Sequence, residues 1–459
     1  MDDSFRAHLA RILDAHVEWR ATWEHMESDE SLRVDNEHVA AALEDFFARM
    51  RDNYPFFHPM YAGQMLKPPH PVALLGYFAA QLVNPNNHAL DGGPATGAME
   101  KEVVRDLASL FGYSAHLGHL TSSGTIANLE ALWVARSIHP DRAIAFSENA
   151  HYTHARMCEV LGVRTVTIPA DARGRMDADA LQRISLSENI GTVVATIGTT
   201  GLGALDPLAD ILALGRARGF RVHADAAYGG FFRLLADGSA PGVDASVYTS
   251  LHECDSIVVD PHKHGLQPYG CGAVLFRDPS VGRFYKHDSP YTYFTSTDLH
   301  LGEISLECSR PGAAAAALWL TLRCLPLRSG EGLGPVLRHC RGAALAWADL
   351  IRTSAVLYLV TEPDLDIVTF FPATDEPTAS AVSAASERVF RTGMDAAQRP
   401  VYLSLLRVRT ELLRTRYPHL IADREWTTVL RSVLMKPEHA RIVEELHRRV
   451  EKLCSNERS

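Results

Sequence analysis

The sequence contains few cysteines and no long apolar run. Only seven of its 459 residues are cysteine. No two of them form a Cys-x-x-Cys pair, which argues against a zinc or disulfide framework and favours free thiols in a reducing compartment. The apolar runs are no longer than a β-strand, so none is expected to span a membrane. The first six residues also lack the basic and apolar regions of an export signal. Together these absences predict a cytoplasmic protein.

An excess of positive charge is absent as well. The 45 lysines and arginines are outnumbered by 55 aspartates and glutamates, which gives a formal net charge of −10. A surface of this sign repels polyanions, so neither nucleic acid nor a membrane is expected as the main partner. A small anionic ligand is still compatible with this charge, because the local field decides its binding.

A recognisable metal-ligand set is the third absence. Histidines are closely spaced at His116 and His119, at His151 and His154, and at His262 and His264. None of these pairs belongs to a His-Glu-x-x-His motif or has an evident third ligand. No metal is therefore predicted.

The middle of the chain alternates between short apolar runs and helical patterns, which predicts an α/β domain over residues 95–330 with a mostly parallel, seven-stranded type of sheet. The expected helices are 96–111, 124–138, 152–161, 178–186 and 209–218. The expected strands are 117–120, 143–146, 165–168, 192–197, 221–224, 256–259 and 272–276.

The two ends of the chain have different patterns. Residues 1–94 are expected to form an N-terminal arm for dimerisation, with amphipathic helices at 2–27 and 37–51 and a further helix at 71–82. Residues 331–459 are expected to form a smaller α+β domain. Its expected helices are 335–353, 379–392 and 437–454, and its expected strands lie near 356–360 and 366–371.

Lys263 and Asp225 follow two of the expected strands. In a parallel sheet, ligands gather outside the carboxyl ends of the strands. Pyridoxal 5'-phosphate needs an amine that forms a Schiff base with its aldehyde and an anion that keeps its pyridine nitrogen protonated. A lysine and a carboxylate at separate strand ends supply both, so the pair predicts a pyridoxal-phosphate enzyme.

Three further segments bear on this prediction. Residues 121–128 open a helix with small and hydroxyl side chains, which predicts either a phosphate cradle or an ordinary helix N-cap. Lys263 and Asp225 favour the cradle. His151 could stack on the pyridine ring or could be structural, and Thr199 and Thr200 could contact a ring substituent or close a turn.

These motifs resemble the group II pyridoxal-phosphate decarboxylases of fold type I, over roughly residues 55–435. The run Asp-Pro-His-Lys-x-Gly-Leu-x-Pro after residue 259 is most similar to archaeal-type tyrosine/aspartate decarboxylases. Ser309-Arg-Pro-Gly312 also resembles sphingosine-phosphate lyases and bacterial glutamate decarboxylases. The remaining motifs that carry the resemblance are Thr121–Asn128, Thr196-Ile-Gly-Thr-Thr200 and His223-Ala-Asp-Ala-Ala-Tyr-Gly-Gly230.

The resemblance implies a role for each matching residue. It makes Lys263 the Schiff-base lysine and Asp225 the partner of the pyridinium nitrogen, with His151 and Ala227 on the two faces of the ring. Thr200 would lie near the ring hydroxyl. The residues implied at the phosphate are Ser123, Gly124, Thr125 and His262.

The resemblance also implies a homodimer with a shared active site. A loop tyrosine would donate a proton after decarboxylation, and Tyr293 is preferred to Tyr291. The substrate carboxylate would bind Arg431, with Arg310 as the second candidate.

The implied reaction is the decarboxylation of an L-amino acid, with an aromatic or acidic side chain favoured. Two enzymatic alternatives remain open, namely carbon–carbon cleavage of the lyase type and an oxidative deamination that yields an aldehyde. A catalytically silent pyridoxal-phosphate-binding protein is the more distant alternative.

Overall fold

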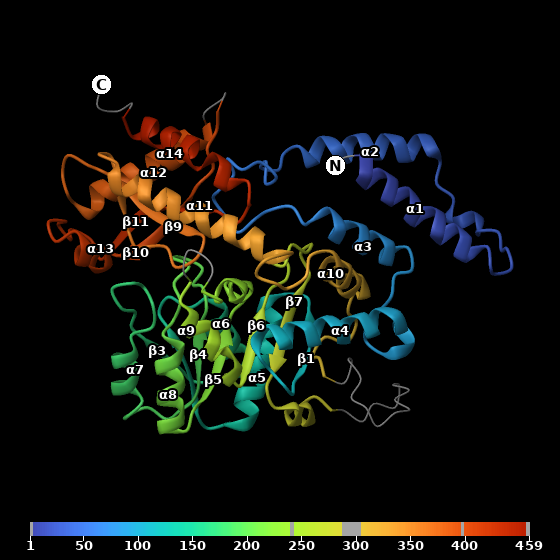
Figure 1. Cartoon of the computed structure of the whole chain (residues 1–459), viewed down its shortest axis with the longest axis horizontal. Coiled ribbons are helices and arrows are strands. Elements are labelled where there is room, and N and C mark those ends of the chain that lie inside the picture. Colours follow the sequence, from blue (N-terminus) through green and yellow to red (C-terminus); the bar gives the residue numbers. More distant parts are fainter. Residues whose placement is uncertain (1–2, 239–242, 287–303, 396–398, 456–459) are drawn as a thin grey trace.

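The computed structural model describes residues 3–238, 243–286, 304–395 and 399–455. Figure 1 shows a large α/β domain, a smaller domain on a second sheet, and two N-terminal helices that project from the body. This architecture confirms the predicted fold class.

The large domain is built on a seven-stranded sheet in the order β1-β7-β6-β5-β4-β2-β3. Only β7 runs antiparallel to its neighbours, so the carboxyl ends of the other six strands share one edge. Most of the strands are buried throughout, as expected of a sheet covered on both faces. The strands are β1 (Leu117–Thr121), β2 (Ala143–Ser147), β3 (Thr165–Ile168), β4 (Ile190–Thr196), β5 (Arg221–Asp225), β6 (Ser256–Val259) and β7 (Gly272–Phe276).

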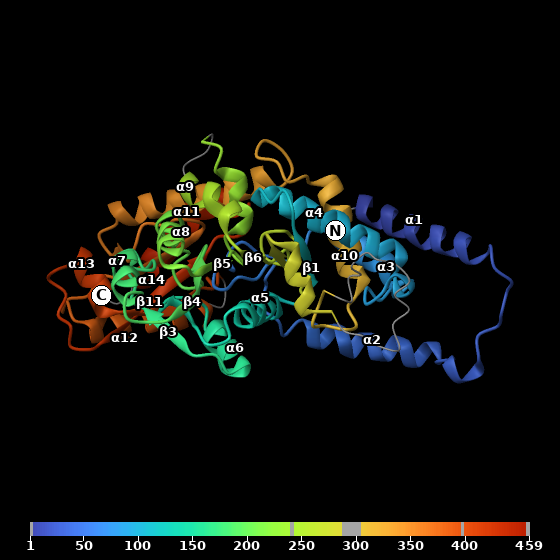
Figure 2. The same cartoon turned by 90° about the horizontal axis from the view of Figure 1, so that it is seen from below.

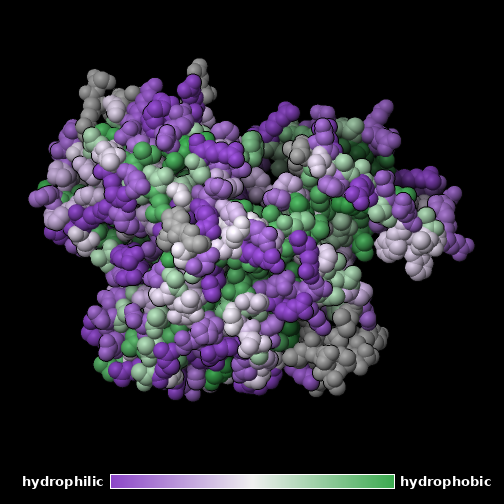
Figure 3. Space-filling view, in the orientation of Figure 1, coloured by the Kyte–Doolittle hydropathy of each residue, from purple (hydrophilic) through white to green (hydrophobic). Residues whose placement is uncertain are grey.

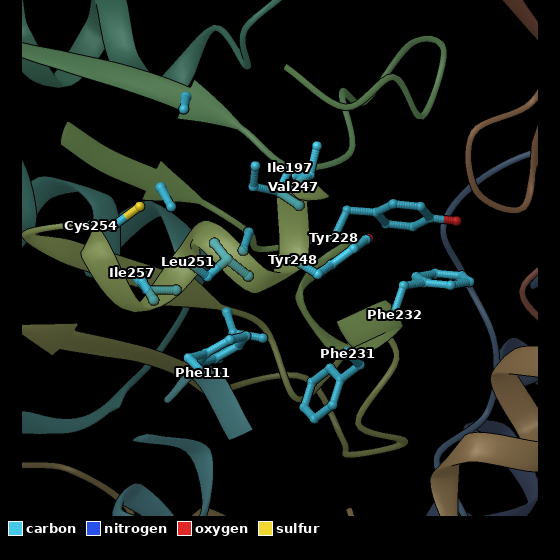
Figure 4. Packing of buried hydrophobic residues seen from close by; sticks show 14 of the residues in the cluster. Phe111, Ile197, Tyr228, Phe231, Phe232, Val247, Tyr248, Leu251, Cys254 and Ile257 are labelled. Carbon is cyan, nitrogen blue, oxygen red and sulfur yellow. The ribbon is translucent and has the colours of Figure 1, made fainter. Parts of the chain in front are cut away.

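Helices cover this sheet and bury a large apolar core. Figure 4 shows part of that core, where Phe111, Ile197 and Ile257 pack beside the aromatic side chains that follow β5. The predicted helices are present, with ends shifted by at most two residues. They are α4 (Pro94–Phe111), α5 (Gly124–Ile138), α6 (Thr153–Leu161), α7 (Ala178–Ile184) and α8 (Leu208–Arg218), and a short α9 (Ala245–Thr249) was not predicted.

The smaller domain has an antiparallel sheet in the order β10-β11-β9-β8. The sequence analysis predicted β8 (Leu357–Leu359) and β9 (Ile367–Pro372) but missed β10 (Ser404–Arg409) and β11 (Trp426–Val433). The helices of this domain are α11 (Leu333–Thr353), α12 (Ala379–Asp395), α13 (Thr410–Arg416) and α14 (His439–Ser455).

The N-terminal region is joined to the body by a contact between two helices that are distant in sequence. Helix α3 (Pro71–Gln81) packs against α10 (Gly312–Cys324), a helix that the sequence analysis did not predict. Gly76 permits this contact, because a Cβ there would lie 3.0 Å from Cα of Ala317.

The first two helices, α1 (Asp3–Arg20) and α2 (Asn36–Met50), bury none of their residues. The expected first helix, to residue 27, was too long. Figure 2 shows the two helices apart and projecting beyond the body, and Figure 3 shows apolar side chains in this region. Within the described ranges, no helix combines the length and the apolar character of a membrane span.

Candidate active site

The carboxyl edge of the large sheet brings together the predicted site residues. Asp225 is the last residue of β5, and Lys263 follows the end of the adjacent strand β6. His151 follows β2, Thr200 follows β4, and Ser123 follows β1. Segments that are up to 140 residues apart in sequence, from Ser123 to Lys263, therefore meet at one edge.

Asp225 is a buried carboxylate with two hydrogen bonds. Its Oδ2 lies 2.8 Å from Nε2 of His154, and its Oδ1 accepts a hydrogen bond from the backbone N–H of Ala227 at 3.2 Å. Burial alone would raise the pKa of Asp225, but the hydrogen bond and charge of His154, with the charge of Lys263, lower it well below its usual range. Asp225 is therefore held as an anion.

His154 was missed as a site residue by the sequence analysis, which noted it only for its spacing from His151. It is fully buried in the first turn of α6, and its Nδ1 has no hydrogen-bond partner among the described residues. An ionised carboxylate can only accept a hydrogen bond, so Nε2 of His154 is the donor in its contact with Asp225. His154 therefore serves Asp225 as a hydrogen-bond donor.

Asp260 holds the side chain of Lys263. The Lys263 Nζ lies 3.0 Å from Oδ2 of Asp260, three residues earlier in the chain. Burial would lower the pKa of Lys263, but the carboxylates of Asp260 and Asp225 raise it above its ordinary value. The lysine is thus kept at the strand edge near both carboxylates. Its spacing from Asp260 was visible in sequence, but the contact was not predicted.

The segment before α5 has the geometry of a small-residue cradle. Ser123 is the N-cap of α5, and its hydroxyl accepts the backbone N–H of Ile126 at 3.3 Å. Gly124 is buried, and a Cβ at this position would lie 2.5 Å from Oδ2 of Asp260. Thr125 is exposed at the first turn. The N-terminus of a helix suits an anionic group, and this one lies close to the segment that carries Asp260 and Lys263.

His262 directly precedes Lys263, and His151 lies in a different segment, after β2. Nδ1 of His262 lies 2.8 Å from the carbonyl oxygen of Cys271, and its ring packs near Tyr269. Nδ1 of His151 lies 2.5 Å from the hydroxyl of Thr153. Burial lowers the pKa of His151, and the nearby charges of Asp225 and Lys263 act on it in opposite directions. His151 is therefore close to both candidate cofactor residues and favours its neutral form.

A cavity of about 780 Å³ opens beside His151 and Thr200, between the large domain and the small sheet. Arg431 of β11 lies on its wall and is almost fully buried. Its Nε donates to the carbonyl of Gly201 and its Nη1 to the carbonyl of Gly63. Its Nη2 finds no hydrogen-bond partner among the described residues. Arg431 therefore retains a donor for an anionic ligand.

Arg310 lies just before α10, and both terminal nitrogens of its guanidinium are occupied by the protein, while its Nε has no hydrogen-bond partner among the described residues. Its Nη1 contacts Glu100 at 2.5 Å and donates to the carbonyl of Leu120, while its Nη2 donates to the carbonyl of Asn87. A substrate carboxylate would have to displace the buried Glu100. These contacts favour Arg431 over Arg310 as the candidate for the substrate carboxylate.

Tyr293 and Tyr291 lie outside the described residues, so the proton-donor role stays a prediction. The spaced histidines have other partners: His119 contacts the buried Glu130 at 2.9 Å, and His264 lies 3.3 Å from Asp366. Like His154, each faces a single carboxylate.

A mostly parallel sheet with a lysine and an anionic carboxylate on adjacent strand ends, next to a helix N-terminus, defines the class of fold type I pyridoxal-phosphate enzymes. A model of the pyridoxal-dependent decarboxylase conserved domain matches residues 25–372. The chain therefore belongs to this family. The predictions of pyridoxal phosphate as cofactor and of amino-acid decarboxylation as the reaction are confirmed.

Individual relatives agree with the family. The chain is 28% identical to an L-tyrosine decarboxylase of Enterococcus faecium, over 83% of this chain and 82% of that protein. It is also 28% identical to an L-aspartate decarboxylase of Thermococcus kodakarensis, over 73% and 85% of the two chains.

Solved structures show the same fold. A crystal structure of mouse CSAD has a TM-score of 0.78 with 21% identity and covers 98% of both chains. The structure of a Burkholderia pseudomallei sphingosine-1-phosphate lyase has a TM-score of 0.71 with 19% identity, over 95% of this chain and 94% of that one.

Proposed function

We propose that the substrate of this decarboxylase is an L-amino acid with an aromatic or acidic side chain. The observation that carries the site assignment is the pair of contacts at adjacent strand ends, Lys263 with Asp260 and Asp225 with His154. The names of the relatives, which include tyrosine and aspartate decarboxylases, support the two substrate classes.

The described residues fit pyridoxal phosphate, which when bound supplies a ring that withdraws the electron pair released from the substrate. Lys263 would hold the cofactor covalently. Asp225 would keep a proton on the pyridine nitrogen, since it is anionic and buried. His151 and Ala227 would lie against the two faces of the ring, and the methyl-sized side chain of Ala227 suits a flat neighbour.

The phosphate would bind at the N-terminus of α5. Backbone N–H groups of Gly124 and Thr125 belong to the first turn, where an α-helix leaves such donors unpaired. The hydroxyl of Ser123 and the ring of His262 would add hydrogen bonds. Thr200 would contact the ring hydroxyl from the end of β4.

The α-carboxylate of the substrate would bind Arg431. Its unpartnered Nη2 and its place on the cavity wall support this role, and its other nitrogens are fixed by backbone carbonyls. A fixed guanidinium orients a carboxylate with little loss of conformational freedom. The small domain would thus set the orientation of the substrate over the cofactor.

The test is a screen of the twenty amino acids for release of CO₂, with analysis of the second product. An amine as second product, obtained from an aromatic or acidic substrate, is expected. An aldehyde with ammonia would indicate the oxidative alternative, and a cleaved side chain would indicate the lyase. Release from aliphatic or basic amino acids alone would contradict the proposed substrate class.

Replacing His154 by phenylalanine is expected to weaken cofactor binding about ten-fold or more. The change keeps a ring in the core but removes the donor to Asp225, and a hydrogen bond to a charged group is worth about 1.5–3 kcal/mol. A fluorescence titration of the apoprotein with pyridoxal phosphate measures this. His154→Gln, which retains an N–H donor, should lose less, and equal affinities for both variants and the wild type would refute the role.

The chain is also proposed to act as a homodimer in the cytosol. Helices α1 and α2 and the segment between them expose large apolar side chains, including Trp19 at 52% in α1 and Trp23 at 72% after it, which a second subunit would cover. The six cysteines that precede α14 are free thiols, which supports a reducing compartment. Deleting residues 1–51 should lower both the dimer fraction and the affinity for the cofactor. Sedimentation that shows a fully active monomer would contradict this.

A further inference from the structure

Asp366 connects the small domain to the loops that carry Lys263 and Asp225. It directly precedes β9 and is fully buried. Its Oδ1 accepts a hydrogen bond from the hydroxyl of Tyr228 at 2.5 Å, and its Oδ2 lies 3.3 Å from Nε2 of His264. Tyr228 is three residues after Asp225, and His264 directly follows Lys263. One carboxylate of the small domain therefore contacts both loops.

The contacts around Asp366 form a packed cluster. The ring of His264 lies edge-on to Tyr228 and to Phe232, with ring centroids 4.8 Å and 4.9 Å apart. Figure 4 shows Tyr228 beside Phe232, with its hydroxyl at the outer end of the core. Leu266, two residues beyond His264, has φ of +62°. A leucine keeps this backbone conformation only where surrounding contacts determine it, so the loop after Lys263 has a fixed shape.

The charge of Asp366 fits this arrangement. Burial alone would raise its pKa, but His264, Tyr228 and Lys67 lower it below the ordinary value. A buried carboxylate is stable only when it is paired and hydrogen-bonded. Side chains from both loops therefore contact one carboxylate of the small domain. If either loop moved away from Asp366, this buried anion would lose a partner.

We propose that Asp366 is a positioning residue that fixes the Lys263 loop relative to the Asp225 loop, and both relative to the small domain. The inference rests on the proposed function, because it assumes that the cofactor lies between these two loops. Arg431 is on β11, which pairs with β9. Asp366 would thus also keep the substrate arginine in register with the cofactor residues.

The test compares Tyr228→Phe and Asp366→Asn with a matched control, Tyr113→Phe. Tyr113 is also a buried tyrosine of the same core, but its hydroxyl donates to the carbonyl of Cys254, away from the two loops. The holoenzymes are compared by kcat, KM, thermal unfolding and the circular dichroism of the bound cofactor in the visible range. That dichroism reports the orientation of the cofactor, which a loss of stability alone would leave unchanged.

Tyr228→Phe and Asp366→Asn are expected to change the cofactor dichroism and to lower kcat about ten-fold or more, with a smaller change in KM. The effects of the two changes should be less than multiplicative in the double variant, because both weaken the Tyr228–Asp366 contact, while only Asp366→Asn also weakens the contact with His264. Tyr113→Phe should keep the wild-type dichroism and kcat.

The inference is overturned if the Tyr228 and Asp366 variants match Tyr113→Phe in dichroism and kcat, whatever their stability. It is also overturned if the double variant shows the full product of the two single effects. A wild-type protein that binds no pyridoxal phosphate would instead refute the proposed function. The two failures are distinguished by the cofactor spectrum of the wild type.

Discussion

Replacing Lys263 by alanine should abolish turnover and the covalent link to pyridoxal phosphate while the fold persists. Lys263 is the amine that contacts Asp260 and lies near Asp225 at this edge of the sheet. The fold should persist because the side chain lies at a loop and not in the apolar core. The substitution removes only the ion-pair partner of Asp260. Leaving this buried acceptor unpaired costs about 1–3 kcal/mol of folding free energy.

Mass spectrometry after borohydride reduction checks this assignment. The wild type should carry the pyridoxyl group on Lys263, and the alanine variant should carry none. Lys436→Ala is a matched control, because Lys436 is also buried but donates to the backbone carbonyl of Tyr61. This control should retain the label on Lys263. A pyridoxyl group on any other lysine of the wild type would refute the site.

Most strands of the large sheet could be predicted because they are short, apolar and buried. The runs 256–259 and 272–276 coincide with β6 and β7, which are buried throughout. The strands β10 and β11 could not be found in the same way. Strand β10 is at the edge of the small sheet, and β11 is next to it. Arginines and threonines interrupt the apolar residues of these strands, as the arginines do in Ser404–Arg409. Partly exposed strands lack the continuous apolar signal of buried ones.

Lys263 and Asp225 were easier to predict than the residues that hold them in place. Lys263 and Asp225 follow strands, and their chemistry is specific. His154 and Asp366 act through contacts across 71 and 138 residues of sequence, with Asp225 and Tyr228. No local pattern marks such pairs, because the sheet and the small domain bring them together. The spacing of His151 and His154 was a visible signal, but the sequence analysis weighed it only as a possible metal motif, which it rejected.

Replacing Asp225 by asparagine should leave the cofactor bound and remove most of the activity. The amide has nearly the shape of the carboxylate, so the contact with Ala227 and the surrounding packing can persist. A neutral amide cannot hold a proton on the pyridine nitrogen, and the ring then withdraws electrons weakly. The loss of such a preorganised charge costs roughly a hundred- to a thousand-fold in kcat. Steady-state measurement of CO₂ release determines this factor.

An N-methylated cofactor analogue separates the charge from every other effect of the substitution. Its pyridine nitrogen is permanently positive, so it should restore part of the activity of Asp225→Asn. Asp206→Asn is the matched control, because Asp206 is also a fully buried carboxylate of the same domain, with backbone partners at Met176 and Thr196. The analogue should not restore activity lost through Asp206, since that loss would come from altered packing. A near-normal rate for Asp225→Asn without any response to the analogue would contradict the role of Asp225, and the anion at the end of β5 would then be structural.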